Sequence, residues 1–438
     1  MSTETTGLVA PAHRPRRART LSLLTASTAM DNTESSLTTV LFPLMREALG
    51  LSSAALGTVV AVSKAVGVFA AFPWALLAHR YPRKTVLAVC SGFWGVWVIF
   101  AGFSTSFLQF VVLYGIAAAG FAGAGPIALS ILGDIYDDDR RGRATGVLYG
   151  GVAIIAGGSA PLFGLLSGSA DGWRYGYIIS GGVCLLIGIL IVLFLDDPQQ
   201  DAIPPGPAPA QPLEKLEGKA RVIRRELREL LGIESFRLIL WQRALSGQNV
   251  IMSFGAVFLV EDRGFSTAAA AVVALPFAAG YLSGTIVGGR VNDAIHRALP
   301  RSGRVVMLQA SQILFAAVGL LTTQLVWGSI ASYAVLFALL GFLQGQVPVV
   351  NRPLIMAVVA PRLRPLAFAV SVSMVEGLAY AGYALLTGFL GDAIGLQGAL
   401  LLVTVVLTAV NGIGSAVLYR PYARDSAAIS ESETKCLG

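Results

Sequence analysis

Charged side chains are scarce in this chain. Asp, Glu, Lys and Arg make up 13% of its 438 residues, about half the fraction typical of a soluble domain. A fold surrounded by water on all sides is therefore excluded. Cysteine is rare as well, since Cys90, Cys184 and Cys436 provide neither a disulfide framework nor spaced metal ligands.

Histidine is equally rare and is limited to His13, His79 and His296. The three lie far apart along the chain, and no G-x-x-x-x-G-K-[ST] run accompanies them. An enzyme needs a nucleophile, a base or a metal that converge on one site. We therefore predict that the chain is not an enzyme, that it does not use ATP, and that it holds no cofactor and no metal.

Apolar residues, in contrast, make up 55% of the chain, about 241 residues. A membrane-spanning helix needs roughly 20 of them, so this inventory provides roughly twelve spans. The apolar runs place them at 21–44, 54–78, 85–103, 107–132, 144–167, 175–195, 235–260, 266–289, 305–325, 327–350, 366–389 and 398–419. The predicted fold class is an all-α membrane protein with twelve transmembrane helices in two pseudo-symmetric six-helix bundles.

The distribution of positive charge predicts the orientation in the membrane. The terminal tails and the connections on their side hold 25 of the 32 Lys and Arg, whereas the opposite loops hold only Arg46, Arg174 and Arg263. Because Lys and Arg are enriched in cytosolic loops, we predict an integral protein of the plasma (cytoplasmic) membrane with both termini in the cytosol. The basic pI follows from this topology, and nucleic acid is not a predicted partner. The first span also resembles a secretory signal, which is an alternative for that segment.

The longest connection divides the spans six and six. We predict a cytosolic N-terminal tail (1–20), an N-terminal six-helix bundle (21–195), a cytosolic linker (196–234), a C-terminal six-helix bundle (235–424) and a cytosolic C-terminal tail (425–438). The linker begins with six prolines between Pro198 and Pro212, which enforce an extended spacer. An amphipathic helix follows, suited either to an anionic leaflet or to packing on the cytosolic ends of the spans.

A short motif follows the second span. It reads Ala75-Leu-Leu-Ala-His79-Arg80-Tyr-Pro82-Arg83-Lys84 and resembles the signature loop of the major facilitator superfamily, with alanine, histidine and proline at three of its usual positions. The resemblance implies the major facilitator fold and a cytosolic gate between this loop and the end of span four. We assign to that gate His79, Arg80, Arg83, Lys84 and Asp134, with Asp293 and Arg297 at the matching place in the second half.

Within that superfamily the chain is most similar to the Spinster-like branch. The similar stretches are Met30-Asp31-Asn32, the segment from Arg143 to Gly158, and the segment from Pro361 to Val370. The branch usually has an Arg-Gly pair in span four, where this chain has Tyr114-Gly115. The branch implies lysolipids, sphingoid-like amphiphiles or organic acids as substrates.

Five ionisable residues lie at bilayer depth, where each is a functional candidate because burying a charge there is costly. Asp31 and Glu34 share one face of span one at i, i+3 spacing. Two such carboxylates resist ionising together, so we predict that this pair carries a proton. Lys64, Arg243 and Glu376 are the predicted ion-pair partners: a span-one acid with Arg243, and Lys64 with Glu376, in one state of a cycle. Permanent structural ion pairs are the alternative.

Polar residues in the spans are the predicted lining of a substrate cavity. They are Tyr114, Gln242, Gln248, Asn249, Gln344, Gln346, Asn351, Arg352 and Tyr380. Together these features predict a secondary active transporter that moves an amphiphilic or organic small molecule by alternating access, coupled to protons. The expected partners are that substrate, protons and membrane lipid, with the protein a monomer. Two alternatives remain open: a non-transporting receptor or sensor on the same scaffold, and a membrane-embedded enzyme.

Overall fold

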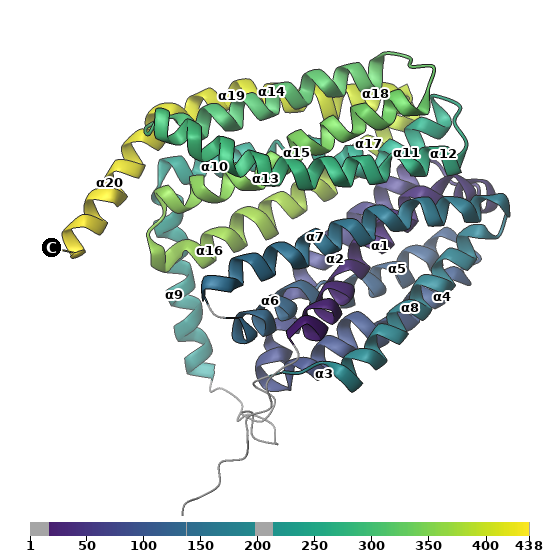
Figure 1. Ribbon diagram of the computed structural model, residues 1–438, viewed down its shortest axis with the longest axis horizontal. Helices are drawn as coiled ribbons and strands as arrows, with labels where there is room; N and C mark the ends of the chain where they lie inside the picture. The colour runs from purple at the N-terminus through teal and green to yellow at the C-terminus, as the bar shows by residue number, and fades with distance from the viewer. Residues whose placement is uncertain (1–16, 137, 198–212, 438) are drawn as a thin grey trace, which may run out of the picture.

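The computed structural model describes residues 17–136, 138–197 and 213–437, and all regular structure in these ranges is helical (Figure 1). Eleven helices in the described ranges are long and apolar enough to cross a membrane. Helix α1 (Arg17–Leu49) is not among them because many threonines and serines make it more polar, although its 33 residues reach about 50 Å. Together with α1 they make twelve long helices, and the predicted all-α membrane fold is confirmed. The predicted tail up to residue 16 and the Pro-rich spacer 198–212 lie outside the described residues.

The first bundle is built from α1 and the helices that follow it as far as residue 194. These are α2 (Ser53–Arg80), α3 (Arg83–Leu87), α4 (Val96–Gly102), α5 (Phe107–Phe121), α6 (Ala124–Ile135), α7 (Asp138–Leu165) and α8 (Gly172–Phe194). A π-helical turn η1 (Ala88–Gly92) and a 3-10 turn η2 (Phe93–Gly95) join α3 to α4 in one span, and η3 (Leu166–Gly168) extends α7. An aromatic cluster of Phe110, Trp173 and Tyr177 lies in the core of this bundle.

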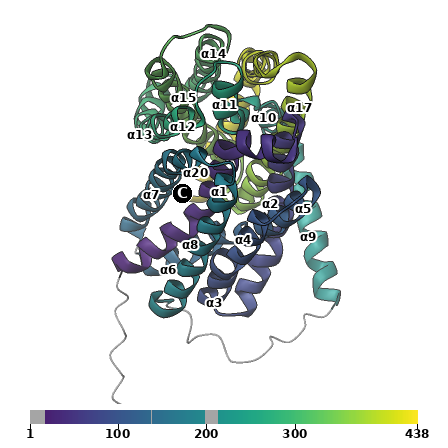
Figure 2. The ribbon, with the colours of Figure 1, turned by 90° about the vertical axis from the view of Figure 1, so that its right-hand side faces the viewer.

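The second bundle follows a linker helix, α9 (Leu213–Gly232). Its helices are α10 (Glu234–Ala244), α11 (Val250–Glu261), α12 (Thr267–Val272), α13 (Ala274–Ala298), α14 (Gly303–Gln324), α15 (Ile330–Val358), α16 (Arg364–Phe368), α17 (Gly377–Ile394), α18 (Leu396–Leu400), α19 (Leu407–Gly414) and α20 (Tyr419–Leu437). Short turns connect them: the 3-10 turns η5 (Gly247–Asn249), η6 (Pro361–Leu363) and η9 (Ser415–Leu418), and the π-helical turns η7 (Ala369–Glu376) and η8 (Leu401–Val406). Figure 2 shows the second bundle lying above the first.

Two faces of the molecule are distinguished by the chain ends. We call the face with the start of α1 and the end of α20 the tail face, and the face with the tight turns at Gly50, Gly264 and Gly395 the far face. Helix α9 runs crosswise to the long helices at the tail face (Figure 1). Its Leu230 is fully buried against the second bundle, and its Glu229 pairs with Arg362. The predicted linker helix therefore exists, and its C-terminal end packs on protein.

The span formed by α5 and α6 is broken at Ala122 and Gly123. Such a break leaves backbone carbonyls without helical partners, and in a membrane these must be satisfied internally. The indole N–H of Trp74 donates to the Ala119 carbonyl at 2.7 Å, and that of Trp94 donates to the Ile116 carbonyl at 2.6 Å. Glycine at position 123 allows the Trp74 ring to approach, since a Cβ there would lie 2.7 Å from it.

A row of glycines on α7 measures how far apart the two bundles lie. Gly146, Gly150, Gly157 and Gly164 share one face of this helix because their spacings of four, seven and seven residues are close to whole turns. A Cβ at Gly164 would lie 2.8 Å from Ala271 and one at Gly157 would lie 2.7 Å from Ala278. At Gly150 the nearest atom is 3.8 Å away, and at Gly146 none lies within 4 Å. The bundles thus touch toward the far face and separate toward the tail face.

Further contacts join the bundles at the far face. Arg46 at the end of α1 pairs with Glu261 at the end of α11. The Asp392 carboxylate of α17 accepts the backbone N–H groups of Ser53 at 2.7 Å and Ala54 at 3.0 Å. Because these amides are the first of α2 and have no helical partner, the second bundle caps a helix of the first. The far face is therefore closed by polar as well as by apolar contacts.

Candidate functional site

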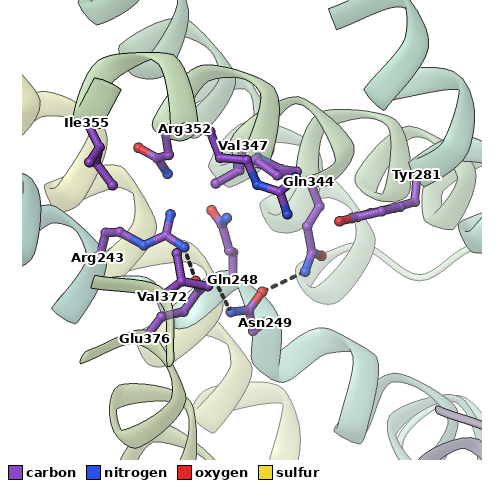
Figure 3. Close-up of a pocket in the computed structure, with 12 residues that line it drawn as sticks. Arg243, Gln248, Asn249, Tyr281, Gln344, Val347, Arg352, Ile355, Val372 and Glu376 are labelled. Atoms are coloured by element: carbon purple, nitrogen blue, oxygen red, sulfur yellow. Dashed lines mark hydrogen bonds and ion pairs between the residues drawn. The ribbon is translucent and has the colours of Figure 1, made fainter. Parts of the chain in front are cut away.

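A polar cavity of about 200 Å³ lies on the inner side of the second bundle (Figure 3). We call it the arginine cavity. Its polar lining residues are Arg243, Gln248, Asn249, Tyr281, Gln344, Asn351, Arg352 and Glu376. They come from α10, η5, α13, α15 and η7, so four different spans meet there.

The local sequence explains why these spans present polar groups. The span formed by α10 and α11 is interrupted at Ser246, whose ψ of 70° leaves the helical region, and Gly247 follows in a 3-10 turn. Glycine is required there because a Cβ would lie 2.1 Å from the Val403 carbonyl. The interruption orients Gln248 and Asn249 toward the cavity. In α15, Pro353 removes the N–H that would bond the carbonyl four residues earlier, and Asn292 donates to that carbonyl at 3.4 Å instead.

An ion pair between Arg243 and Glu376 crosses the arginine cavity. The Asn249 amide donates to the other oxygen of Glu376 at 3.4 Å and accepts from the Gln344 amide at 2.7 Å (Figure 3). The Arg352 guanidinium interacts electrostatically with Arg243 and with Tyr281. Two guanidinium groups therefore face one carboxylate, which leaves the cavity with one excess positive charge.

Several polar atoms around the arginine cavity have no hydrogen-bond partner among the described residues. They are the side-chain carbonyl oxygens of Gln248 and Gln344, both amide atoms of Asn351, and Nε of Arg243. A buried polar group without a partner costs about 1–3 kcal/mol, and native proteins therefore keep few of them. Their concentration around one cavity is typical of a site that binds a polar ligand.

A second cavity of about 290 Å³ lies between the bundles, and we call it the lysine cavity. Asp31, Ser63 and Lys64 line it from the first bundle, and Ser373 and Gly377 line it from the second. The Lys64 ammonium lies 5.8 Å from the centre of the Tyr380 ring and is attracted by Asp31. The Tyr380 hydroxyl is hydrogen-bonded to Ser253 at 2.6 Å. Residues 376 and 377 are adjacent in sequence and line one cavity each, so the two cavities are neighbours.

The observed ion pairing differs from the pairing predicted from the sequence. Arg243 pairs with Glu376 inside the second bundle, and Lys64 faces Asp31 inside the first. The pairs predicted from the sequence would cross between the bundles in one state of the cycle, and they stay a prediction for another conformation. In this conformation each bundle places an acid near its own buried cation. Arg243 meets Glu376 because η7 winds as a π-helix up to Glu376 and packs against α10, which carries Arg243.

The two span-one carboxylates lie in different surroundings. Asp31 lines the lysine cavity, whereas Glu34 is buried in the first bundle and accepts a hydrogen bond from Ser180 at 3.0 Å. Glu34 lines neither of the two cavities. Three residues along a helix rotate a side chain by about 60°, which is enough to turn Glu34 toward α8.

Three predicted cavity residues pack between helices instead. Tyr114 stacks on Phe110 in the aromatic cluster of the first bundle. Gln242 is buried near Asn411, which donates to the Gln242 backbone carbonyl at 3.0 Å, and Gln346 lies against Gly288. All three are polar residues in spans, and sequence alone does not show which side of a span faces a cavity.

The predicted gate is only partly assembled. Arg83 donates to Asp134 at 2.7 Å and to Asp197 at 2.6 Å, so the expected contact between this loop and span four exists within the first bundle. Arg80 lies over the ring of Tyr81, and Arg297 bonds the backbone of Asp293 in its own helix. No ion pair between the bundles is described for Lys84, and the His79 side chain lies outside the described residues. Among the gate side chains that the structure describes, no ion pair or hydrogen bond crosses the tail face, where the bundles are apart.

Two residues of functional interest were not predicted. Tyr281 lines the arginine cavity from a span rich in glycine and alanine. A single tyrosine in such a span was the one feature of the sequence that could have indicated a cavity residue. Asp392 caps α2 across the bundle interface. Its role could not be predicted because it lies near a span end, where acidic residues are common. In the described part of the chain, no cluster of three or more His, Cys, Asp or Glu side chains is suited to a metal ion.

Twelve long helices in two bundles, with a polar cavity in the second, are the architecture of a polytopic membrane protein. Comparison with known proteins agrees. Residues 23–300, more than half of the chain, match the Major Facilitator Superfamily. A probable sulfoacetate transporter of Cupriavidus necator is 29% identical over 58% of this chain, and the match spans 60% of that relative. Protein spinster homolog 1 of Xenopus laevis is 24% identical over 37% of this chain and 31% of its own length.

The fold also matches solved structures. A bacterial homologue of the human lysosomal transporter Spinster, in an inward-facing and unoccupied conformation, gives a TM-score of 0.72 at 20% identity, over 96% of this chain and 98% of that one. The chain therefore belongs to the Major Facilitator Superfamily, a family of transporters rather than enzymes, and it spans less than two thirds of the length of the two curated relatives named above. The predicted resemblance to its Spinster-like branch is confirmed.

Proposed function

We propose that this protein is a secondary transporter of small organic anions. The observation that carries the proposal is the arginine cavity, where Arg243 and Arg352 face a single carboxylate, Glu376. An excess guanidinium attracts a carboxylate or sulfonate and can bind it through two parallel hydrogen bonds. The unpartnered amides of Gln248 and Asn351 are available for hydroxyl or carbonyl groups of the same ligand.

The size of the arginine cavity favours a small acid over a lipid. Its volume of about 200 Å³ is below the range of about 300–1,000 Å³ that is common for drug-sized ligands. The lining is polar on several sides, which suits a hydrated metabolite better than an acyl chain. Of the amphiphilic and organic substrates predicted from the sequence, we therefore favour the organic class in its anionic form. The sulfoacetate named for the relative from Cupriavidus necator belongs to that class.

Alternating access is the mechanism that the helix arrangement supports. The bundles touch at Gly157 and Gly164 and are apart at Gly146, so this conformation opens toward the tail face. We assign the tail face to the cytosol because 25 of 32 Lys and Arg lie on its side. Rocking of the bundles about the site would close the tail face and open the far face.

Proton coupling through the span-one carboxylates is part of the proposal, and Asp31 is the better placed of the two. It lines the lysine cavity together with Lys64, whereas Glu34 is enclosed by the first bundle. Protonation of Asp31 would remove its attraction for Lys64. Because this cavity also contacts Ser373 and Gly377 of the second bundle, the change would act where the bundles meet.

Ligand-dependent thermal stability tests the proposed substrate class. Purified protein is heated with sulfoacetate, glucuronate or glucose, the last two differing chiefly in one carboxylate. At a concentration of 100 times Kd, binding adds about 2.7 kcal/mol to stability, so we expect sulfoacetate or glucuronate to raise the Tm and glucose to leave it unchanged. Arg243→Gln should abolish the shift, whereas Arg297→Gln, at the exposed end of α13, should retain it. Equal shifts with glucose and glucuronate would contradict the proposal.

A further inference from the structure

Among the described residues, Glu376 is the only carboxylate that lines the arginine cavity. It forms an ion pair with Arg243, the more buried of the two arginines there. The Arg243 side chain is 6% exposed, whereas that of Glu376 is 24% exposed. An anion that enters the cavity therefore meets Arg243 with a carboxylate already in place. The anion must either bind Arg352 alone or replace Glu376.

We propose that the transported anion displaces Glu376 from Arg243 and that the released Glu376 carboxylate takes up one proton from the cavity water. The proposal rests on the proposed function, because it requires an organic anion as substrate. It assigns to Glu376 a role that the sequence left to the span-one acids, namely a proton site that is linked to substrate binding itself.

The charges balance in this exchange. Before binding, the ion pair is neutral and the anion and proton are free in water. After binding, the anion pairs with Arg243, and Glu376 is a neutral acid that carries the added proton. A carboxylate that loses its cation in a site shielded from water is destabilised in its charged form, and protonation removes that penalty. Each anion bound therefore brings one proton.

The groups around Glu376 are consistent with this exchange. Arg243 of α10 and Arg352 of α15 are the cations that face the cavity, and Tyr281 of α13 is the neutral titratable group. Asn249 contacts both sides of the network, since its amide N–H donates to Glu376 and its carbonyl accepts from Gln344. After displacement the Asn249 amide can hydrogen-bond either to the Glu376 side chain or to the bound anion. The other nearby charges, Asp31 and Lys64, face each other in the lysine cavity and do not compete for Arg243.

The backbone around Glu376 is irregular and lies close to the first bundle. Glu376 is the last residue of η7, an eight-residue π-helical segment, and Gly377 follows it. π-helical turns inside α-helices concentrate at functional sites. A Cβ at position 377 would lie 2.9 Å from Val68 of the first bundle. A shift of Glu376 would therefore change the contact between Gly377 and Val68, which joins the two bundles.

Proton uptake on binding tests the proposal directly. Sulfoacetate is added to purified protein in weakly buffered solution at pH 7.5, and the protons taken up per bound anion are measured with a pH indicator. We expect about one proton per anion for the unchanged protein and none for Glu376→Gln. The affinity of the unchanged protein should fall about tenfold per pH unit above neutrality, because one proton is linked to binding. Glu376→Gln should bind with constant affinity over the same range.

Asp171→Asn is the matched control, because it removes a carboxylate that is 63% exposed and lines neither cavity, and it should retain one proton per anion. An infrared difference spectrum of the unchanged protein serves as a second measurement that needs no variant: sulfoacetate should produce the carbonyl band of a protonated acid. Proton uptake by Glu376→Gln, absence of the band, or failure of Glu376→Gln to bind the anion at any pH would each overturn the proposal. If the unchanged protein binds neither sulfoacetate nor glucuronate at any pH, the proposed function itself is wrong.

Discussion

The glycine row of α7 allows the two conformations of the proposed cycle to be favoured separately. In the present conformation a Cβ added at Gly157 would lie 2.7 Å from the Ala278 side chain, whereas a Cβ added at Gly146 would have no atom within 4 Å. A leucine at 157 would therefore clash only while the far face is closed. A leucine at 146 is accommodated now and would clash once the tail face closes.

The expected size of the effect follows from the cost of overpacking. Extra methylenes forced into a packed contact cost about 1–3 kcal/mol, which changes the ratio of two conformations by about 5- to 150-fold. Replacing glycine in a helix also adds about 1 kcal/mol of helix propensity, but this gain is the same in both conformations and cancels. Gly157→Leu should shift the population toward tail-closed molecules, and Gly146→Leu should shift it toward tail-open ones.

Distances between spin labels at positions 80 and 297 provide the assay. Both residues are exposed on the tail face, one on each bundle, and the labels require a background in which Cys90, Cys184 and Cys436 are replaced. Gly157→Leu should increase the short-distance population and Gly146→Leu the long-distance one. If both variants move the distribution in the same direction, or neither moves it, the two-state reasoning is refuted.

Three further predictions concern single side chains. Arg352→Gln should weaken sulfoacetate binding about 10- to 150-fold in a titration, because a hydrogen bond to a charged group contributes about 1.5–3 kcal/mol; unchanged affinity would remove Arg352 from the site. Asp31→Asn should lower, but not abolish, uptake driven by a pH gradient in proteoliposomes, because Glu376 still takes up its own proton, while exchange without a gradient continues; unchanged gradient-driven uptake would contradict the role of Asp31 as a proton carrier. Trp74→Phe should lower stability to denaturant by about 1–3 kcal/mol because the Ala119 carbonyl at the helix break loses its donor; an unchanged midpoint would show that water replaces the indole.

The sequence predicted the helices well because each span is a long apolar run, and such runs have few alternatives in a membrane. Every predicted span has a helical counterpart in the structure. The breaks inside spans were not predicted. They depend on contacts remote in sequence, such as the carbonyl of Val403 against Gly247 and the indole of Trp74 against Ala119.

The candidate site was predicted in part for a similar reason. An ionisable residue in an apolar run is conspicuous, so Asp31, Lys64, Arg243 and Glu376 could be selected from the sequence. The partners of these residues could not be predicted from the sequence, because pairing depends on how far each helix is rotated about its axis. Glu34 shows the difference: it is three residues from Asp31, yet it bonds Ser180 in the interior of the first bundle.

Counterflow tests most directly whether an anion bound in the arginine cavity crosses the membrane. Proteoliposomes loaded with unlabelled sulfoacetate are diluted into a trace of labelled sulfoacetate, and the labelled compound inside is followed over time. We expect a transient accumulation that Arg243→Gln abolishes and that loading with glucose does not support. Binding of sulfoacetate without any accumulation would contradict it and would identify the protein as a receptor on a transporter scaffold.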